Sequence, residues 1–294
     1  MAQLGFIGLG IMGRPMAGHL LAAGNTVHVY DVNAASVKEL VAKGAVGCES
    51  SRVVAENSDI IFTMVPDTPD VENALFGDEG IASGAKPGSV VVDMSSISPI
   101  ATKDFAKRLE DLGVDMLDAP VSGGQVGAEK AILSIMVGGR QEVFDRVKPF
   151  FEVMGKSMVL IGGNGAGQTC KVSNQIAVAV TIAAAAEALT FASKAGADPA
   201  KVREALMGGL AGSRILELLG ERMIKRNFEP GGPLRINQKD VNLALQMARS
   251  LHMSLPFTAV AQEMYSAAAA RAGMEADHSS MVLALEQLAN HSVA

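Results

Sequence analysis

The sequence predicts an α/β domain built on a mostly parallel sheet, followed by an all-helical domain. Two observations support this division. Strand and helix patterns alternate from Gln3 to Ile161, and no convincing strand follows the glycine-rich segment 162–167. Repeated alternation of this kind is typical of a parallel sheet with helices on both faces. We therefore expect an α/β domain at residues 1–162 and an all-α domain at residues 163–294.

Hydrophobic periodicity gives the expected elements in chain order. In the first domain, strands are expected at Gln3–Ile7, Thr26–Tyr30, Asp59–Met64, Ser89–Asp93, Asp115–Leu117, Ile132–Val137 and Met158–Ile161, with helices at Arg14–Ala23, Ala34–Ala42, Pro69–Phe76, Pro99–Leu112 and Glu142–Met154. The second domain is expected to begin with a long interdomain helix, Gln168–Ala195, of roughly 42 Å at about 1.5 Å per residue. Further helices are expected at Pro199–Met207, Arg214–Lys225, Lys239–Leu251, Phe257–Ala272 and Ser279–Ala289.

Composition excludes several classes of protein. The chain has 294 residues, of which 49% are hydrophobic and 19% are charged, so disorder and collagen-like structure are excluded. Lys and Arg number 25 against 31 Asp and Glu, and a net charge of −6 does not attract a phosphate backbone. We expect no nucleic-acid partner.

The apolar run Ile176–Ala186 is shorter than the roughly 20 residues that cross a bilayer, so we interpret it as a buried helix and expect no membrane partner. Cys48 and Cys170 form no metal or disulfide pattern, which fits a reducing cytoplasm. The five histidines show no metal-ligand spacing, and no metal site is predicted. The apolar helix is buried either by its own chain or by a partner, and the expected assembly is a homo-oligomer, a dimer or a tetramer.

A glycine motif directly after the first strand predicts a Rossmann-type dinucleotide site. Residues Gly8, Leu9, Gly10, Ile11, Met12 and Gly13 form a GxGxxG pattern that opens a helix. Such glycines allow the tight turn, the approach of a pyrophosphate and close helix packing. Asp31 ends the second strand, where a carboxylate binds ribose hydroxyls and repels the 2′-phosphate of NADP, so NAD is favoured over NADP. The alternative is that the glycines only form a turn and Asp31 caps a helix.

Further loops follow other strands at the edge of the sheet that lines the ligand crevice. Met64, Val65 and Pro66 follow one strand, and Ser95 and Ser96 follow another. These loops are candidate walls for cofactor or substrate. The alternative for each serine is ordinary turn chemistry, with Ser96 or Ser98 capping the helix that begins at Pro99.

The segment Ser122, Gly123 and Gly124 offers one hydroxyl and two residues without side chains. Backbone amides and a hydroxyl suit a small carboxylate. We expect a β-carbon at Gly123 to fill the space that the carboxylate needs. A plain turn explains the same glycines equally well.

Two lysines are candidates for chemistry. Lys171 and Asn174 lie three residues apart near the start of the long helix, so they project from one face. A positioned ammonium can protonate the alkoxide that forms when a hydride reduces a carbonyl group. The alternative is that Lys171 extends to solvent. Lys239 and Asp240 are expected to begin another helix, where a surface ion pair is the alternative interpretation.

The order of these motifs resembles that of the β-hydroxyacid dehydrogenase family, which includes 3-hydroxyisobutyrate dehydrogenases, over essentially the whole chain. The resemblance implies that Lys171 is catalytic, that Ser96, Ser122, Gly123, Gly124 and Asn174 hold substrate, and that Lys239 closes over the cofactor. It places Ser96 near both substrate and nicotinamide, and the position of Met64, Val65, Pro66, Ser95 and Ser96 at the ends of strands predicts cofactor contacts from these loops. One segment, Glu229–Leu234, is richer in Gly and Pro than the family pattern.

Within the family, the segments Asp93–Pro99, Gly208–Ser213 and Asp277–Ser279 are similar to those of members that reduce tartronate semialdehyde to glycerate. The resemblance therefore implies an NADH-dependent reductase of a small aldehyde or hydroxyacid that bears a carboxylate. A dehydrogenase of 3-hydroxyisobutyrate or of another small 3-hydroxyacid is the nearest alternative. A different alternative is a catalytically inactive dinucleotide-binding protein used for interactions, which would have little reason to keep Lys171 with Asn174.

Overall fold

The computed structural model describes residues 2–293 and divides the chain into two compact units, Met1–Lys171 and Val172–Ala294. Met1, the first residue of the expected α/β domain, and Ala294, the last residue of the expected helical domain, lie outside the described residues. The boundary between the units falls inside helix α8, Ala166–Lys194, whereas the boundary expected from the sequence precedes that helix. The division at residue 162 remains a prediction. The fold class, an α/β domain followed by a helical domain, is confirmed.

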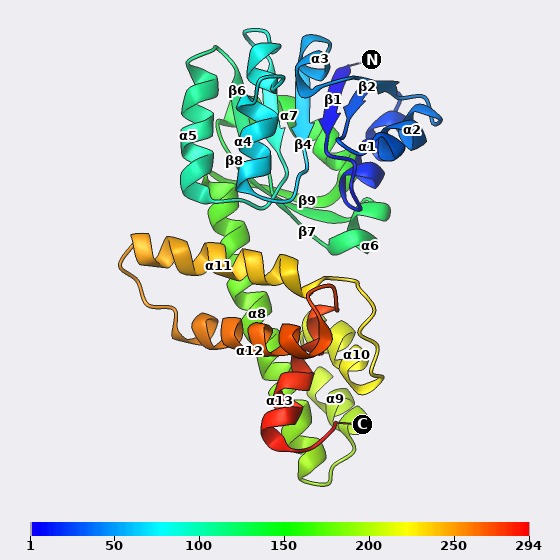
Figure 1. Cartoon of the computed structure of the whole chain (residues 1–294), viewed down its shortest axis with the longest axis vertical. Coiled ribbons are helices and arrows are strands. Elements are labelled where there is room, and N and C mark those ends of the chain that lie inside the picture. Colours follow the sequence, from blue (N-terminus) through cyan, green and yellow to red (C-terminus); the bar gives the residue numbers. More distant parts are fainter. Residues whose placement is uncertain (1, 294) are drawn as a thin grey trace. The chain divides into compact units, whose positions relative to one another are not determined.

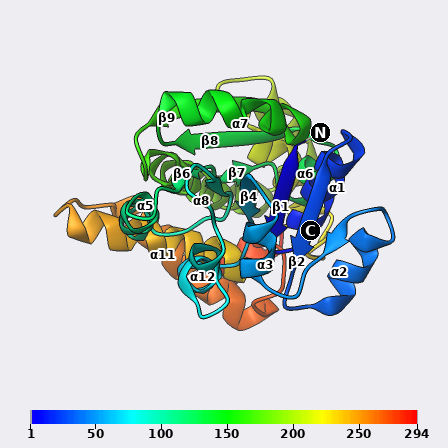
Figure 2. The ribbon, with the colours of Figure 1, turned by 90° about the horizontal axis from the view of Figure 1, so that it is seen from above.

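The strands of the first unit form one nine-stranded sheet within the described residues (Figures 1 and 2). Its order is β3-β2-β1-β4-β5-β6-β8-β7, and β9 also pairs with β8. The strands are β1 Gln3–Ile7, β2 Thr26–Tyr30, β3 Val46–Gly47, β4 Ile60–Thr63, β5 Val90–Asp93, β6 Asp115–Asp118, β7 Val121–Ser122, β8 Leu133–Gly138 and β9 Gly155–Gly162. Strands β3-β2-β1-β4-β5-β6 are parallel. The chain adds strands on one side of β1 up to β3 and then crosses to the other side with β4, and doubly wound sheets bind ligands at this switch point.

Helices cover both faces of this sheet. One core cluster joins α1 Gly13–Ala22, α2 Ala34–Val41 and α7 Gln141–Met154 to one face, and a second cluster joins α3 Ser51–Glu56, α4 Thr68–Phe76 and α5 Pro99–Glu110 to the other. Strands β4 and β5 are buried along their whole length. Burial on both faces explains why these strands are continuous apolar runs rather than alternating patterns.

Five elements of the first unit lie outside the set predicted from the sequence: β3, α3, a 3₁₀ turn Ile81–Ser83, β7 and α6, Gly124–Glu129. All are short, and the two strands contain only two residues each. Segments of this length give too few residues for a periodicity to emerge. The side chain of Ser50 starts α3 by accepting a hydrogen bond from the amide of Val53.

The second unit is helical. After α8 it contains α9 Pro199–Met207, a π-helical turn Leu216–Gly220, α10 Glu221–Ile224, α11 Leu234–Ser250, α12 Pro256–Ala272, a 3₁₀ turn His278–Ser280 and α13 Met281–Ala289. Helices α11 and α12 lie side by side (Figure 1). The core of this unit joins Ile182 and Leu189 of α8 to Tyr265 and to the segments around them.

Helix α8 is longer than the apolar run that the sequence suggested. It has 29 residues, and an 18-residue window with mean hydropathy 1.8 makes it long and apolar enough to span a bilayer by composition alone. The expectation that this segment is too short to cross a membrane is therefore wrong as an argument from length. The core helix of a soluble protein satisfies the same criteria, so one such helix is weak evidence for a membrane protein.

Helix α11 begins at Leu234, five residues before Lys239, so the expectation that Lys239 and Asp240 start this helix is wrong. The amides of Gly231 and Gly232 donate hydrogen bonds to Asp277 Oδ2, at 3.0 and 2.9 Å. A β-carbon at Gly232 would lie 3.0 Å from the His278 ring. The Gly- and Pro-rich segment therefore packs closely against Asp277 and His278. Helix α11 begins directly after it, five residues before the expected start.

Two glycines of helix α1, Gly13 and Gly18, allow a matched test of the close packing between this helix and the glycine-rich turn before it. A β-carbon at Gly13 would collide with the carbonyl oxygen of Gly8, whereas one at Gly18, in the same helix, meets nothing within 4 Å. Gly13→Ala should lower thermal stability and abolish most NADH binding. Gly18→Ala should leave binding intact and stabilise the fold by about 0.5–1 kcal/mol, because alanine loses less backbone entropy in a helix. Thermal melts and fluorescence titration with NADH measure both effects; equal binding by the two variants would contradict the close packing of Gly8 and Gly13.

Candidate active site

The glycine motif forms a turn between β1 and α1 that is exposed at Gly10. Gly8 has φ +92°, and a β-carbon there would collide with the Met64 carbonyl. Gly10 is exposed, and a β-carbon there would meet nothing within 4 Å. The turn is therefore packed against the protein at Gly8 and Gly13 and open at Gly10. That shape fits the pyrophosphate of a dinucleotide at a helix N-terminus.

Asp31 lies beside this turn at the end of β2. Its Oδ2 accepts a hydrogen bond from the Leu9 amide at 2.5 Å, and its Oδ1 accepts one from the Asn33 amide at 2.7 Å. The residue that caps α2 is Asn33, whose side chain accepts a bond from the Ala35 amide. The interpretation of Asp31 as the cap of α2 is therefore wrong. Its carboxylate instead fixes the glycine turn and lies where the ribose of a dinucleotide is bound in this fold.

The loops after β4 and β5 are joined through Ser95. This serine is fully buried, and its hydroxyl accepts a hydrogen bond from the Val65 amide at 3.0 Å. Ser96 is half-buried by contrast. The helix that begins at Pro99 is capped by Ser98, through the Ala101 amide, as one of the alternatives anticipated. The hydroxyl of Ser95 is therefore engaged in joining the two loops.

Asp93 lies beneath the second loop with no exposed surface. Its Oδ1 accepts hydrogen bonds from the Thr63 hydroxyl at 2.8 Å and from the Ser95 amide at 3.1 Å. Burial raises the pKa of Asp93 to about 6; these hydrogen bonds oppose the shift, and the nearby Asp118 carboxyl adds to it. The Asp93 carboxyl therefore keeps its proton to a higher pH than an exposed carboxyl does, while it holds the start of the loop.

Asp118, at the end of β6, binds the start of helix α8. Its Oδ1 accepts from the Gly165 amide at 2.7 Å, and its Oδ2 accepts from the Gln168 amide at 2.9 Å. Burial raises the pKa of the Asp118 carboxyl, and the hydrogen bonds from these amides act in the opposite direction. A carboxylate at the amino end of a helix interacts favourably with the helix dipole. The first turn of α8 is thus attached to the edge of the sheet.

The Gln168 side chain makes a second attachment between α8 and the sheet. Its Oε1 accepts a hydrogen bond from the Ile97 amide at 3.1 Å, and its Nε2 donates one to the Ser95 carbonyl at 2.7 Å. Gln168 is fully buried. Lys171 follows one helical turn later and is 9% exposed. The interpretation of Lys171 as a lysine that reaches solvent is therefore wrong.

Ser122 ends β7, and the next two residues both need glycine. Gly123 has φ +138° and Gly124 has φ +60°. A β-carbon at Gly123 would lie 3.1 Å from the Leu133 side chain and 3.4 Å from Gly127, so it would not enter open space. The expectation that a β-carbon at Gly123 fills the carboxylate space is wrong; of these two glycines, Gly124 is the one whose β-carbon position is open.

Two predicted residues, Asn174 and Lys239, belong to the second unit, where a chain of contacts joins them. Asn174 Nδ2 donates to Gln175 Oε1 at 2.8 Å, and Gln175 Nε2 donates to Asp240 Oδ2 at 2.7 Å. Lys239 Nζ lies 3.2 Å from Asp240 Oδ1. Asp240 is 4% exposed, so this pair is not the surface ion pair considered for it.

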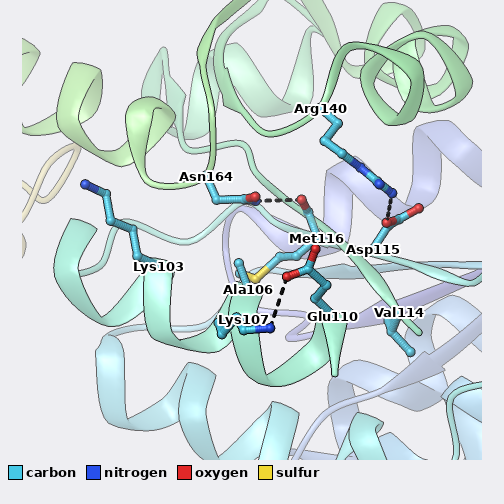
Figure 3. Close-up of a pocket in the computed structure, with 9 residues that line it drawn as sticks. All are labelled: Lys103, Ala106, Lys107, Glu110, Val114, Asp115, Met116, Arg140 and Asn164. Atoms are coloured by element: carbon cyan, nitrogen blue, oxygen red, sulfur yellow. Dashed lines mark hydrogen bonds and ion pairs between the residues drawn. The ribbon is translucent and has the colours of Figure 1, made fainter. Parts of the chain in front are cut away.

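A separate pocket of about 240 Å³ lies beside α5 in the first unit (Figure 3). None of its lining residues belongs to the predicted site. Arg140 forms an ion pair with Asp115, and Lys107 forms one with Glu110 at 3.4 Å. Within residues 2–293, no group of three or more His, Cys, Asp or Glu side chains could hold a metal ion.

Sequence reasoning missed three buried polar residues of the first unit: Asp118 and Gln168 as anchors of α8, and Asp93 as the support of its loop. The available signal was a buried polar side chain at the end of an otherwise apolar strand, because such groups are hydrogen-bonded in folded proteins.

The glycine turn at the switch point and Asp31 beside it define the class of nicotinamide dinucleotide-dependent dehydrogenases. The family model for the NAD binding domain of 6-phosphogluconate dehydrogenase matches residues 3–163. The model for the NAD-binding domain of NADP-dependent 3-hydroxyisobutyrate dehydrogenase matches residues 165–285. Together they cover almost the whole chain.

Individual relatives agree with these models. The 2-hydroxy-3-oxopropionate reductase of Escherichia coli K12 is 59% identical over 99% of this chain and 100% of its own length. The structure of Mycobacterium tuberculosis 3-hydroxyisobutyrate dehydrogenase with L-serine has a TM-score of 0.89 at 29% identity, covering 97% of this chain and 99% of that one. Psf3 in complex with NADP⁺ and 2-OPP has a TM-score of 0.86 at 26% identity, covering 96% and 99%.

The chain belongs to the 3-hydroxyisobutyrate dehydrogenase-like family of oxidoreductases. Its cofactor is a nicotinamide dinucleotide. The family resemblance inferred from the motifs is confirmed, and the alternative of an inactive binding protein loses its basis.

The raised pKa of Asp93 predicts a pH-dependent contribution to stability. The folded protein holds this proton to about pH 6, whereas the ordinary pKa of an aspartic acid side chain is 3.8. Below about pH 4 both the folded and the unfolded chain carry this proton. As the pH rises from about 4 to about 6, the unfolded chain loses the proton before the folded protein does, so the free energy of unfolding falls by about 3 kcal/mol. Relative to wild type, Asp93→Asn should gain stability over this pH range in urea denaturation. The exposed Asp78→Asn is the control, and parallel wild-type and Asp93→Asn curves would contradict the prediction.

Proposed function

We propose that this chain catalyses the NADH-dependent reduction of tartronate semialdehyde (2-hydroxy-3-oxopropionate) to glycerate. The observation that carries this proposal is the 59% identity, over the full length, to a reductase of that name. The buried Lys171 at the anchored start of α8 supports the chemistry. The reverse oxidation of glycerate would use the same groups.

In the proposed reaction each group has one task. The Gly8–Gly13 turn and Asp31 hold the dinucleotide, with Met64, Val65, Pro66 and Ser95 forming the neighbouring wall. When bound, NADH supplies the hydride that reduces the aldehyde carbon. Lys171 donates the proton to the aldehyde oxygen, which becomes a hydroxyl group, and the neutral amine that remains takes up a proton from water.

Substrate binding is proposed for Ser96 and for the segment Ser122, Gly123 and Gly124. The hydroxyls and backbone amides offer hydrogen-bond donors to the substrate carboxylate. Asn174, three residues after Lys171, keeps the substrate role that the family resemblance implies, and Lys239 keeps its role toward the cofactor. The contact of Asn174 with Gln175 and the ion pair of Lys239 with Asp240 would orient both side chains.

A second candidate substrate is 3-hydroxyisobutyrate, because a matching family model and a solved structure carry the name of its dehydrogenase. Steady-state kinetics in one direction, with glycerate and with 3-hydroxyisobutyrate, each with NAD⁺, decide between the two. We expect kcat/KM for the first to exceed that for the second by about 100-fold or more, which is about 2.7 kcal/mol of transition-state binding. A ratio below one would reverse the assignment.

Three further expectations remain predictions: a homo-oligomer of two or four chains, a cytoplasmic location, and the absence of nucleic-acid and membrane partners. Light scattering of the purified chain measures the first directly. The net charge of −6 supports the absence of nucleic acid.

Replacing the proposed proton donor should separate chemistry from cofactor binding. Lys171→Ala should lower kcat by about 10²–10⁴-fold, the usual cost of losing a general acid, and leave NADH affinity nearly unchanged. Lys194→Ala, at the other end of α8, is the control and should keep wild-type kcat. Stopped-flow reduction assays and NADH titration measure both quantities. A Lys171→Ala enzyme with wild-type turnover would remove Lys171 from the reaction.

The preference for NADH is proposed to come from Asp31 and its neighbours. Val32 is 92% exposed, and neither Val32 nor Asn33 can receive a 2′-phosphate as an arginine would. Asp31→Ser with Val32→Arg should raise the ratio of kcat/KM for NADPH over NADH by about tenfold or more, because repulsion is removed and a charged partner is added. Val32→Arg alone is the comparison that isolates the carboxylate. An unchanged ratio in the double variant would show that Asp31 does not set the preference.

A further inference from the structure

Gln168 attaches helix α8 to the loop after β5 through both ends of its side-chain amide. One polar atom of the carboxamide accepts from the Ile97 amide, and the other donates to the Ser95 carbonyl. The side chain is fully buried, so water does not compete for these bonds. Its position in the chain is more than 70 residues from both partners.

The two bonded groups flank a single residue. The carbonyl of Ser95 and the amide of Ile97 belong to the two peptide groups on either side of Ser96. The two soft backbone torsions of a residue lie between its flanking peptide planes. One carboxamide that binds both planes therefore restrains the backbone of Ser96 and the direction in which its side chain leaves the chain.

The first turn of α8, which carries Gln168, is also held in place. The main chain of Gly165 and Gln168 is bound by Asp118, so the first turn of α8 does not move freely against the sheet. Lys171 lies three residues after Gln168, and side chains at this spacing lie on the same face of a helix. Gln168 thus connects the backbone of Ser96 to the helical turn that carries Lys171.

We propose that Gln168 is a positioning residue that sets the Ser96 loop against the proton-donating turn of α8, so that substrate is held at one distance from Lys171. This inference rests on the proposed function, in which Ser96 binds substrate and Lys171 protonates it. Gln168 itself touches neither substrate nor cofactor in this scheme. Its loss acts on the alignment of the reacting groups.

Two substitutions separate alignment from simple packing. Gln168→Met keeps a side chain of similar length and removes both hydrogen bonds. Gln168→Glu keeps the shape and the bond from the Ile97 amide, but an ionised carboxylate cannot donate to the Ser95 carbonyl. Protonation of the introduced carboxyl group restores both bonds, because its hydroxyl donates while its carbonyl accepts.

The surroundings make that protonation accessible. Asp118 of β6 binds the main-chain amide of Gln168, and Asp93 of β5 binds the amide of Ser95, the residue whose carbonyl the Gln168 side chain contacts. The cations of this region are Lys103 of α5, which lies against Gly165, and Lys171, three residues after Gln168. Burial and the two carboxyls favour the neutral form of an introduced acid. The activity of Gln168→Glu relative to wild type should therefore rise as the pH falls.

In assays with tartronate semialdehyde, we expect Gln168→Met to lower kcat by about 10–100-fold while KM for NADH changes by less than about threefold, since small misplacements of reacting groups act on turnover. Gln168→Glu should be similarly impaired near pH 8 and recover toward the wild-type kcat near about pH 5.5. Thr190→Val is the matched control: it removes one buried hydrogen bond within the same helix and should keep kcat within about twofold.

The inference is wrong if Gln168→Met retains wild-type kcat, or if Gln168→Glu shows the same relative activity at every pH. It is also wrong if kcat, NADH binding and thermal midpoint all fall together in both variants, because that pattern reports only a damaged fold.

Failure of the proposed function is recognised separately. If wild type turns over a different small hydroxyacid, the same comparison is made with that substrate. If wild type reduces no substrate of the panel, the proposed function fails, and hydrogen exchange decides the inference alone. Faster exchange of the peptide covering residues 93–99 in Gln168→Met than in Thr190→Val supports the restraint on Ser96, and equal exchange overturns it.

Discussion

The attachment of helix α8 to the edge of the sheet is the interaction on which the rest of the site depends. Asp118 binds the main chain of the first turn, and Gln168 binds the loop after β5. Both contacts are buried, so neither is weakened by solvent. Because Lys171 lies one turn further along, its position follows from these two anchors. A lysine on a freely moving helix could not serve as a precise proton donor.

The same principle explains the polar residues at the ends of neighbouring strands. Asp93 supports Ser95, and the hydroxyl of Ser95 binds the loop after β4. Asp31 supports the glycine turn after β1 in a similar way. The loops are thus fixed by carboxylates and hydroxyls that are buried at Asp93 and Ser95 and half-buried at Asp31. The apolar strands supply the rigid frame, and these few polar groups place the loops that bind ligands.

Much of this could be predicted from the sequence, because the signals are local. The alternation of strands and helices, the glycine turn and the candidate lysine near the start of α8 are all encoded in short segments. The contacts of Gln168 and Asp118 could not be predicted, since their partners lie 71 and 47 residues away. The early start of α11 also depended on a distant residue, Asp277, which binds the amides of Gly231 and Gly232. The direction of a β-carbon at Gly123 also could not be predicted, because it depends on how Leu133 packs against this turn.

The central claim is that Lys171 supplies the proton for carbonyl reduction from an anchored helix. Chemical rescue tests it most directly, because Lys171→Ala leaves a space that a small primary amine can enter. We predict that methylammonium or ethylammonium raises the rate of reduction by this variant in proportion to its concentration, and that amines of different pKa give different rates. No rescue by any small amine, in a variant that still binds NADH normally, would contradict the account.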